Sequence, residues 1–153
     1  MKHRYFFIVM VVLIMTACTT LNVFEKSIPF PSHTWSSTDT PSFHFNITDT
    51  NAFYNLYVVF RHEDGYRYKN IWLHITFHDP DSTYSFNREF TLANNMGWLG
   101  TALDDIVDHR VAFNALPAKL KKGQYTFTLQ QLMREDPLQH VLNAGIRIEK
   151  FTP

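Results

Sequence analysis

Residues 54–78, YNLYVVFRHEDGYRYKNIWLHITFH, contain two runs of alternating apolar and polar side chains separated by a turn sequence. The apolar positions fall at every second residue: Tyr54, Leu56, Val58 and Phe60, and then Ile71, Leu73, Ile75 and Phe77. A period of two is typical of half-buried β-strands. Asp64-Gly65 between the runs is a strong signal for a tight turn. The stretch therefore predicts two strands that are joined as a hairpin.

The same alternation recurs on both sides of this stretch. It covers residues 42–48, 83–93 and 124–131, and a final strand is expected over 144–151. A turn is expected at Pro80. Residues 94–110 break the alternation and predict a long loop with one helical turn near 104–107, and another helical turn is expected after Pro137. Seven or eight short strands with little helix predict an all-β fold, a single antiparallel β-sandwich domain, jelly-roll-like, over residues 33–153.

The beginning of the chain has the pattern of an export signal. Basic residues at 2–4 precede an unbroken apolar run over 5–15, which is shorter than the roughly 20 residues of a membrane-spanning helix. The run ends in Met15-Thr16-Ala17-Cys18, which is typical of a bacterial lipobox. The sequence thus predicts a lipoprotein signal peptide over 1–17 and lipid attachment at Cys18; the alternative is an ordinary signal peptide followed by a buried or free cysteine.

Residues 18–32 carry Pro29 and Pro31 and show no clear period, so they are interpreted as a lipid-anchored tether that can include an edge segment. Thr19 follows the lipidated cysteine, at the position where Asp commonly signals retention at the inner membrane. We therefore expect the protein in the outer membrane, anchored by its lipid and facing the periplasm.

Composition excludes several function classes. Without residues 1–17 the chain has 12 basic and 14 acidic residues, so charge favours neither nucleic acid nor an anionic surface as a partner. A single cysteine cannot form an internal disulfide. Phe, Tyr and Trp make up 24 of the 153 residues, which suits a sheet-rich fold.

The polar motifs give little support for catalysis or for a cofactor. His74 and His78 are four residues apart on a predicted strand, about 13 Å, which is too far for one zinc ion. The acidic stretch at 104–109 could hold a hard cation, but a solvated turn is the simpler interpretation, and the same holds for residues 79–83. Neither a nucleophile elbow nor a glycine-rich phosphate loop is present in the sequence. We expect no catalytic residue, no metal site and no cofactor; a carboxylate pair assembled by folding, as in a glycosidase, stays an alternative.

Two further features are candidates for surface function. Asp81-Ser82-Thr83 fits a short motif for O-glycosylation of exported proteins, which makes Ser82 a possible modification site. Trp35, Trp72 and Trp98 could form a sugar-stacking platform or a protein-binding hot spot, or they could fill the core or its rim.

Several stretches together carry a resemblance to a known family. They are FHFNITD (43–49), YNLYVVFRHEDGYRYKNIWLHI (54–75), MGWLGTALDDIVDHR (96–110) and GQYTFTLQQLMREDPLQHVLNAGIRIEK (123–150), in this order after the lipobox cysteine. The more specific sets are Arg61, Tyr66, Tyr68, Asn70, Trp72 and Leu73, the Gly97–Gly100 turn, Gln130–Arg134 and Gly145–Lys150. Over nearly the whole mature chain, the sequence resembles the gliding-motility lipoprotein GldH.

The resemblance implies a non-catalytic outer-membrane lipoprotein of the gliding apparatus and the linked type IX secretion system. Its partners would be other proteins of that machinery, together with the lipid bilayer through Cys18. Candidate protein-contact residues are Arg61, Trp72, Trp98 and Arg134. The alternative is a glycan-binding β-sandwich lipoprotein of a polysaccharide-uptake system.

Overall fold

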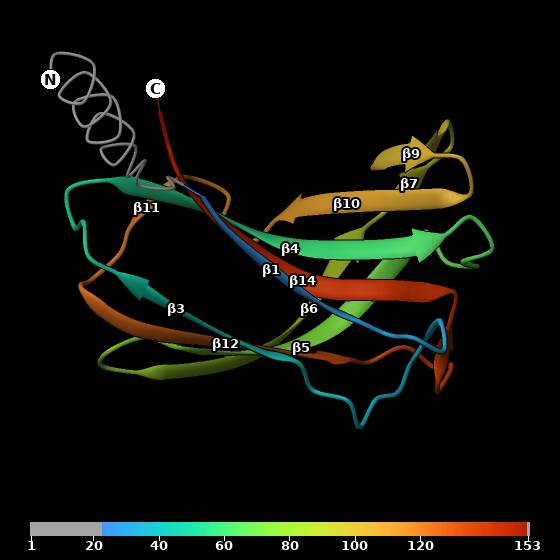
Figure 1. Cartoon of the computed structure of the whole chain (residues 1–153), viewed down its shortest axis with the longest axis horizontal. Helices are drawn as coiled ribbons and strands as arrows, with labels where there is room; N and C mark the ends of the chain where they lie inside the picture. Colours follow the sequence, from blue (N-terminus) through green and yellow to red (C-terminus); the bar gives the residue numbers. More distant parts are fainter. Residues whose placement is uncertain (1–22, 153) are drawn as a thin grey trace, which may run out of the picture.

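Two antiparallel sheets pack face to face in the computed structural model, which describes residues 23–152 (Figure 1). The larger sheet has the order β1 (Val23–Pro29), β14 (Val141–Lys150), β4 (Phe53–Glu63), β10 (Ile106–Ala112), β9 (Thr101–Leu103), with β11 (Ala118–Lys119) also on β4. The smaller sheet has the order β3 (Ser42–Ile47), β12 (Gly123–Gln131), β5 (Asn70–His78), β6 (Thr83–Thr91). Two short ladders join β2 (Thr34–Trp35) to β13 (Leu138–Gln139) and β7 (Ala93–Asn94) to β8 (Gly97–Trp98).

The order of the long strands is that of a jelly roll. Four of them, β1, β14, β4 and β10, lie side by side in one sheet, and β3, β12, β5 and β6 form the other. The chain changes sheet between most consecutive long strands, and β5 and β6 are the pair that stays in one sheet as a hairpin. The predicted all-β antiparallel sandwich is therefore confirmed.

The core lies between the sheets and is built by the alternating side chains. The inward positions predicted in β3, β4, β5 and β12 are almost all buried, with Phe43, Phe60 and Phe127 among the largest fully buried side chains. Phe45 stacks on Tyr125 with ring centroids 5.2 Å apart, and Phe113 meets Phe127 edge-on at 4.9 Å. Each such ring contributes about 1.5–3 kcal/mol through burial, so the aromatic content of the chain is mainly core.

The hairpin predicted at Asp64-Gly65 is wrong. A turn does form there, with the Tyr66 amide donating to the Glu63 carbonyl at 3.0 Å, but β4 and β5 belong to different sheets. The chain crosses the roughly 10 Å between the layers at this point. Tyr66 is buried, and its hydroxyl donates to the Asn70 carbonyl, so the crossing segment closes one end of the core.

The long loop predicted over residues 94–110 is also wrong, because that stretch forms β8, β9 and most of β10. Both predicted helical turns are wrong too. At 104–107 the chain makes a tight β9–β10 turn with Asp104 at φ 52°, because Ile106 and Val107 pair with Glu63 and His62 of β4. After Pro137 the chain continues as β13, which pairs with β2. In both places pairing with a distant strand satisfies the backbone that a helical turn would have satisfied locally.

The folded sandwich begins earlier than residue 33. The edge segment expected in the 18–32 tether is β1, which pairs along its whole length with β14. Cys18 and the signal peptide predicted over residues 1–17 lie outside the described residues. Within residues 23–152 no helix is long and apolar enough to cross a bilayer.

The two ends of the sandwich differ in what they carry. We call the end with Val23, Ile47, Tyr54 and Lys150 the proximal end, because the chain enters the fold there (Figure 1). The opposite end, where β4 finishes at Glu63 and β5 begins at Asn70, is the distal end. The candidate residues below are located by reference to these two ends.

Candidate functional site

A groove at the distal end brings together two of the four predicted contact residues, Trp72 and Arg134. It has a volume of about 400 Å³ and is lined by Tyr68, Asn70, Trp72, Leu132, Met133 and Arg134. Trp72 lies on the outer face of β5, opposite the buried Leu73, and is 41% exposed. Its amide donates to the Met133 sulfur at 3.3 Å, and its carbonyl accepts from the Leu132 amide at 2.9 Å. A half-exposed indole beside an exposed guanidinium is the composition typical of protein-binding hot spots.

Gln131 holds the far wall of this groove in place. It is fully buried, and its side-chain oxygen accepts a hydrogen bond from the Met133 amide at 2.7 Å. Its amide nitrogen donates to the Trp35 carbonyl at 3.4 Å and to Asp136 Oδ1 at 3.2 Å. Asp136 in turn accepts from the Ser37 amide at 2.8 Å, which ties residues 131–136 to the β2 segment. The loop carrying Arg134 is therefore fixed by one buried amide.

The charges around the groove are largely compensated. Arg67 pairs with Glu135, and Asn70 donates to Glu89 at 2.5 Å. Burial and then the Glu135 carboxylate raise the pKa of Tyr68, so its hydroxyl stays protonated. Arg134 is exposed and, within the described residues, takes part in none of these ion pairs. Counted over residues 23–152, the groove thus offers one cation without an ion-pair partner, beside an aromatic surface.

Arg61 lies at the same end but on the outer face of the larger sheet. Its guanidinium donates to Asp108 Oδ2 at 2.7 Å. Asp108 belongs to a row of alternating charges that continues through Arg110, Glu25, Arg147 and Glu149. Hydrogen bonds from Arg110, and also those from Arg147, lower the pKa of Glu25, so this carboxylate is unsuited to donate a proton. The face is a charge-paired surface and gives no support to the alternative of a catalytic carboxylate pair.

Trp98 covers a buried pair of histidines that the sequence analysis missed. His62 and His109 are both buried, with their Nε2 atoms 3.0 Å apart, and the Trp98 ring lies 4.4 Å from the His62 ring. The indole N–H donates to Asp64 Oδ1 at 2.8 Å. Gly100 passes so close that an added Cβ would lie 2.7 Å from His109 Nδ1, which explains the glycine at this position. Trp98 therefore closes the distal end of the core and is only partly exposed.

The tautomers of the histidine pair follow from its contacts. His62 Nδ1 lies 2.6 Å from the Glu63 carbonyl, which can only accept, so His62 donates from Nδ1 and accepts at Nε2. His109 must then donate from Nε2. Burial lowers the pKa of His62, and burial together with the neighbouring His62 lowers the pKa of His109 to about 4. Continuing the inward phase of β4 from Phe60 by two residues would have predicted an inward His62.

The other polar candidates are surface features. His74 and His78 lie on the outer face of β5 and hydrogen-bond to Asn87 and Thr83, both at 2.7 Å. Asp104 and Asp105 are exposed in the β9–β10 turn, whereas His109 is inside, so the acidic stretch does not converge. Within residues 23–152 no three His, Cys, Asp or Glu side chains are grouped to hold a metal ion. Ser82 is exposed in the β5–β6 turn, and its modification stays a prediction.

The three tryptophans do not form a row. Trp35 is fully buried and stacks on Phe30 at 5.2 Å, and Trp98 is half-buried as described above. Only Trp72 of the three presents a large exposed ring. A flat platform for sugar stacking would need neighbouring exposed rings, so the tryptophans give no support to the glycan-binding alternative.

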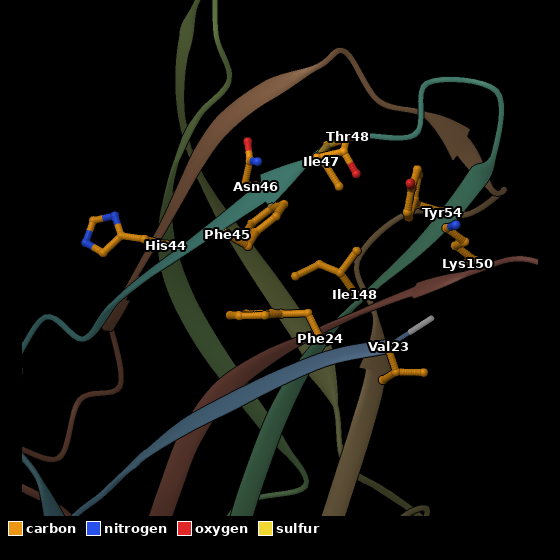
Figure 2. Close-up of a pocket in the computed structure, with 10 residues that line it drawn as sticks. All are labelled: Val23, Phe24, His44, Phe45, Asn46, Ile47, Thr48, Tyr54, Ile148 and Lys150. Carbon is orange, nitrogen blue, oxygen red and sulfur yellow. The ribbon is translucent and has the colours of Figure 1, made fainter. Parts of the chain in front are cut away.

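A second cavity opens at the proximal end, between edge strands β1 and β3 (Figure 2). Its volume is about 530 Å³, and its lining residues are Val23, Phe24, His44, Phe45, Asn46, Ile47, Thr48, Tyr54, Ile148 and Lys150. We call it the side cleft. Lys150 donates to Asp49 at 3.0 Å, and the Tyr54 hydroxyl donates to the Asp49 carbonyl at 2.8 Å. Among the described lining residues Lys150 carries the only fixed charge, and that charge is thereby paired.

Comparison with known proteins identifies a family. The model of the GldH lipoprotein family matches residues 22–148. A gliding motility lipoprotein GldH homolog of Christiangramia forsetii is 23% identical, over 95% of this chain and 94% of the relative. The gliding motility lipoprotein GldH of Flavobacterium johnsoniae is 25% identical, over 90% of this chain and 91% of the relative. The crystal structure of dimeric latent PorU from Porphyromonas gingivalis aligns with 89% of this chain but 13% of its own, at 8% identity and a TM-score of 0.39, which is too low to support an inference.

Proposed function

The chain belongs to the GldH lipoprotein family, and on that premise we propose that it is a non-catalytic outer-membrane lipoprotein of the gliding and type IX secretion machinery, acting through protein contacts. Family membership is the observation that carries this proposal. The curated relatives are named as gliding motility lipoproteins, and neither name describes an enzyme.

Lipid attachment at Cys18 is the first part of the proposal. The lipobox ends five positions before Val23, where the sandwich begins, so an extended tether could span about 17 Å. Such an anchor would hold the proximal end close to the periplasmic face of the outer membrane. It would also raise the effective concentration of the domain towards other proteins at that surface.

The distal end is the proposed contact surface. Arg61, Trp72, Trp98 and Arg134 all lie at or near that end. This is the end opposite the one where β1 begins at Val23 (Figure 1). Exposed apolar side chains gather in the same region: Met96, Leu99, Leu103 and Ile106. Apolar groups with arginine and tryptophan beside them are the usual composition of an interface core. Trp72 and Arg134 are the strongest candidates, since Arg61 is ion-paired and Trp98 covers the core.

The test is a depletion strain of the native host, complemented with variants and scored for type IX cargo in the medium. We expect wild type to restore secretion, Cys18→Ala to fail, and Trp72→Ala with Arg134→Ala to reduce it. Phe53→Ala, an exposed aromatic at the proximal end, is the matched control and should behave as wild type. Each hot-spot residue would contribute about 2 kcal/mol to binding.

The outcomes separate the proposal from its alternative. Unchanged secretion on depletion would refute the role in type IX secretion and would bring the glycan-binding alternative forward, to be tested on immobilised polysaccharide. Full activity of Trp72→Ala/Arg134→Ala would refute the distal groove as the contact surface, while the family role would stand.

A further inference from the structure

The side cleft has walls that suit a hydrocarbon chain. Phe24 from β1, Phe45 and Ile47 from β3, and Ile148 from β14 turn towards one another, whereas His44 points away (Figure 2). The rings of Phe24 and Phe45 are 5.7 Å apart and form one wall of the cleft. Its volume of about 530 Å³ lies within the range of about 300–1,000 Å³ that is usual for small-molecule sites.

The polar groups at the mouth of the side cleft would not have to lose hydrogen bonds or ion pairs when an apolar group binds. Lys150 is held by Asp49, and Asn46 and Thr48 belong to the solvent-facing positions of the strand end. Placing a methylene chain in the cleft removes apolar surface of the chain from water, at about 0.8 kcal/mol for each buried methylene. It also covers what Val23 and Phe24 still expose, since Phe45, Ile47 and Ile148 are already buried. Within the part of the chain that the structure describes, no unpaired charge on the cleft walls would have to be desolvated for this.

The position of the cleft points to a particular occupant. Val23, the first residue of the sandwich, itself lines the cleft, and Cys18 is five positions before it. The extended reach of about 17 Å brings a lipid on Cys18 to the mouth of the cleft. A group tethered this closely is present at a high effective concentration, so even a weak intrinsic affinity would fill the site.

We propose that the side cleft binds an acyl chain carried by Cys18 whenever the protein is away from the bilayer. This rests on the lipidation in the proposed function and adds to it a binding site on the domain itself. The occupied cleft shields one chain of the anchor from water, and the chain leaves the cleft when the anchor enters the membrane, where the hydrocarbon environment is equally apolar.

The first experiment measures the cleft without its tethered lipid. The mature chain with Cys18→Ser is titrated with cis-parinaric acid, a fluorescent fatty acid, below its micelle concentration. We expect one site, with affinity lowered about tenfold or more by Phe24→Asp, since a carboxylate would be placed against the hydrocarbon. Phe53→Asp, the same change at an exposed phenylalanine outside the cleft, should stay within about twofold of wild type. Val23→Asp at the mouth replaces Phe24→Asp if the latter fails to fold.

The second experiment asks whether the protein's own lipid occupies the site. Full-length protein is produced with a diazirine-bearing palmitate, extracted in mild detergent, freed of detergent on adsorbent beads and irradiated as the water-soluble fraction, and the crosslinked peptides are mapped. We expect crosslinks on residues 23–24, 45–47 and 148, reduced in Phe24→Asp and retained in Phe53→Asp.

The readouts keep the two proposals apart. If no palmitate is incorporated, the lipidation of Cys18 is refuted. If palmitate is incorporated but crosslinks fall outside the cleft, or if cis-parinaric acid binds both aspartate variants equally, the cleft is not an acyl site. In that case it is open to an extended segment of another protein.

Discussion

Acidification should destabilise this protein through the buried His62–His109 pair, and replacing His109 should remove most of that effect. Both rings are buried at the distal end, and among the described residues no carboxylate is in hydrogen-bond contact with either, so protonation of the pair is unfavourable in the folded state. The pKa of His109 is lowered from 6.5 to about 4 in the folded chain, mainly by burial and then by His62. The unfolded chain therefore binds more protons than the folded chain between these two values.

The sign and the size follow from this difference. Since the unfolded state takes up the extra proton, the free energy of unfolding falls as pH is lowered from about 6.5 towards 4. The full effect of His109 is about 3 kcal/mol, of which about 2 kcal/mol is lost between pH 7 and pH 5. His62, whose pKa is also lowered by burial, acts in the same direction. A total stability of about 5–15 kcal/mol is usual, so the loss is a large fraction.

The assay is urea unfolding of the mature Cys18→Ser chain at pH 7, 6 and 5, for wild type, His109→Gln and His74→Gln. Glutamine keeps a donor for His62 but does not titrate, and His74 is a matched surface control. Carboxylates with a lowered pKa, such as Glu63 beside His140 and His33, stabilise the folded state at neutral pH and lose this effect mainly below pH 4.5. They therefore contribute little to the change between pH 7 and pH 5. We expect wild type and His74→Gln to lose about 2 kcal/mol and His109→Gln distinctly less. Parallel losses in all three would refute the reasoning.

Three further changes test other parts of the structure. Gln131→Leu removes the buried amide that holds residues 131–136, and should lower the free energy of unfolding by about 1–3 kcal/mol and speed hydrogen exchange of the Met133 amide; unchanged exchange would contradict the role of Gln131. Gly145→Ala places a Cβ against the Lys26 carbonyl and 2.6 Å from Ser27 Cα, so β1 must shift. We expect the free energy of unfolding in urea to fall by about 1–3 kcal/mol and amide hydrogen exchange to be faster along β1 than along β3. Equal exchange in the two strands would count against this prediction. Glu25→Gln breaks the partly exposed ion pairs with Arg110 and Arg147. It should lower the free energy of unfolding by less than about 1 kcal/mol and reduce the dependence of that free energy on salt. A larger loss would contradict the interpretation of this network as a solvent-screened surface feature.

Individual residues show where the alternation of apolar and polar side chains predicts burial correctly and where it does not. Alternation correctly placed Phe43, Phe45 and Ile47 inside, as it did for the inward residues of β4, β5 and β12, because side-chain direction in a strand depends only on position along it. The alternation over residues 83–93 sets Tyr84 and Phe86 in phase with the buried Phe90, yet these two are 50% and 36% exposed. Their strand, β6, is at the edge of its sheet, and an edge has fewer neighbours to cover an inward side chain.

The candidate site could be predicted only in part. The alternation in residues 70–78 puts Trp72 on the face opposite Leu73, but its proximity to Arg134 depends on Gln131 and on the pairing of β5 with β12. The His62–His109 pair joins residues 47 apart in the chain, and only the β4–β10 register brings them together. No short window of sequence contains that information.

Features that depend on neighbours in the chain could be predicted from the residues alone: the long strands β3, β4, β5, β6, β12 and β14, most of their inward faces, and the lipobox that predicts lipid at Cys18. The strands β8, β9 and β10 were missed, and strand pairing follows from long-range contacts that no local pattern contains. The Asp64-Gly65 turn is compatible with a hairpin and with a crossing between sheets, because the turn satisfies the same local hydrogen bond in both. The choice is made by burial of Tyr66 and by the partners that β4 and β5 find in opposite layers. Those long-range contacts place the groove at one end of the sandwich and the side cleft at the other.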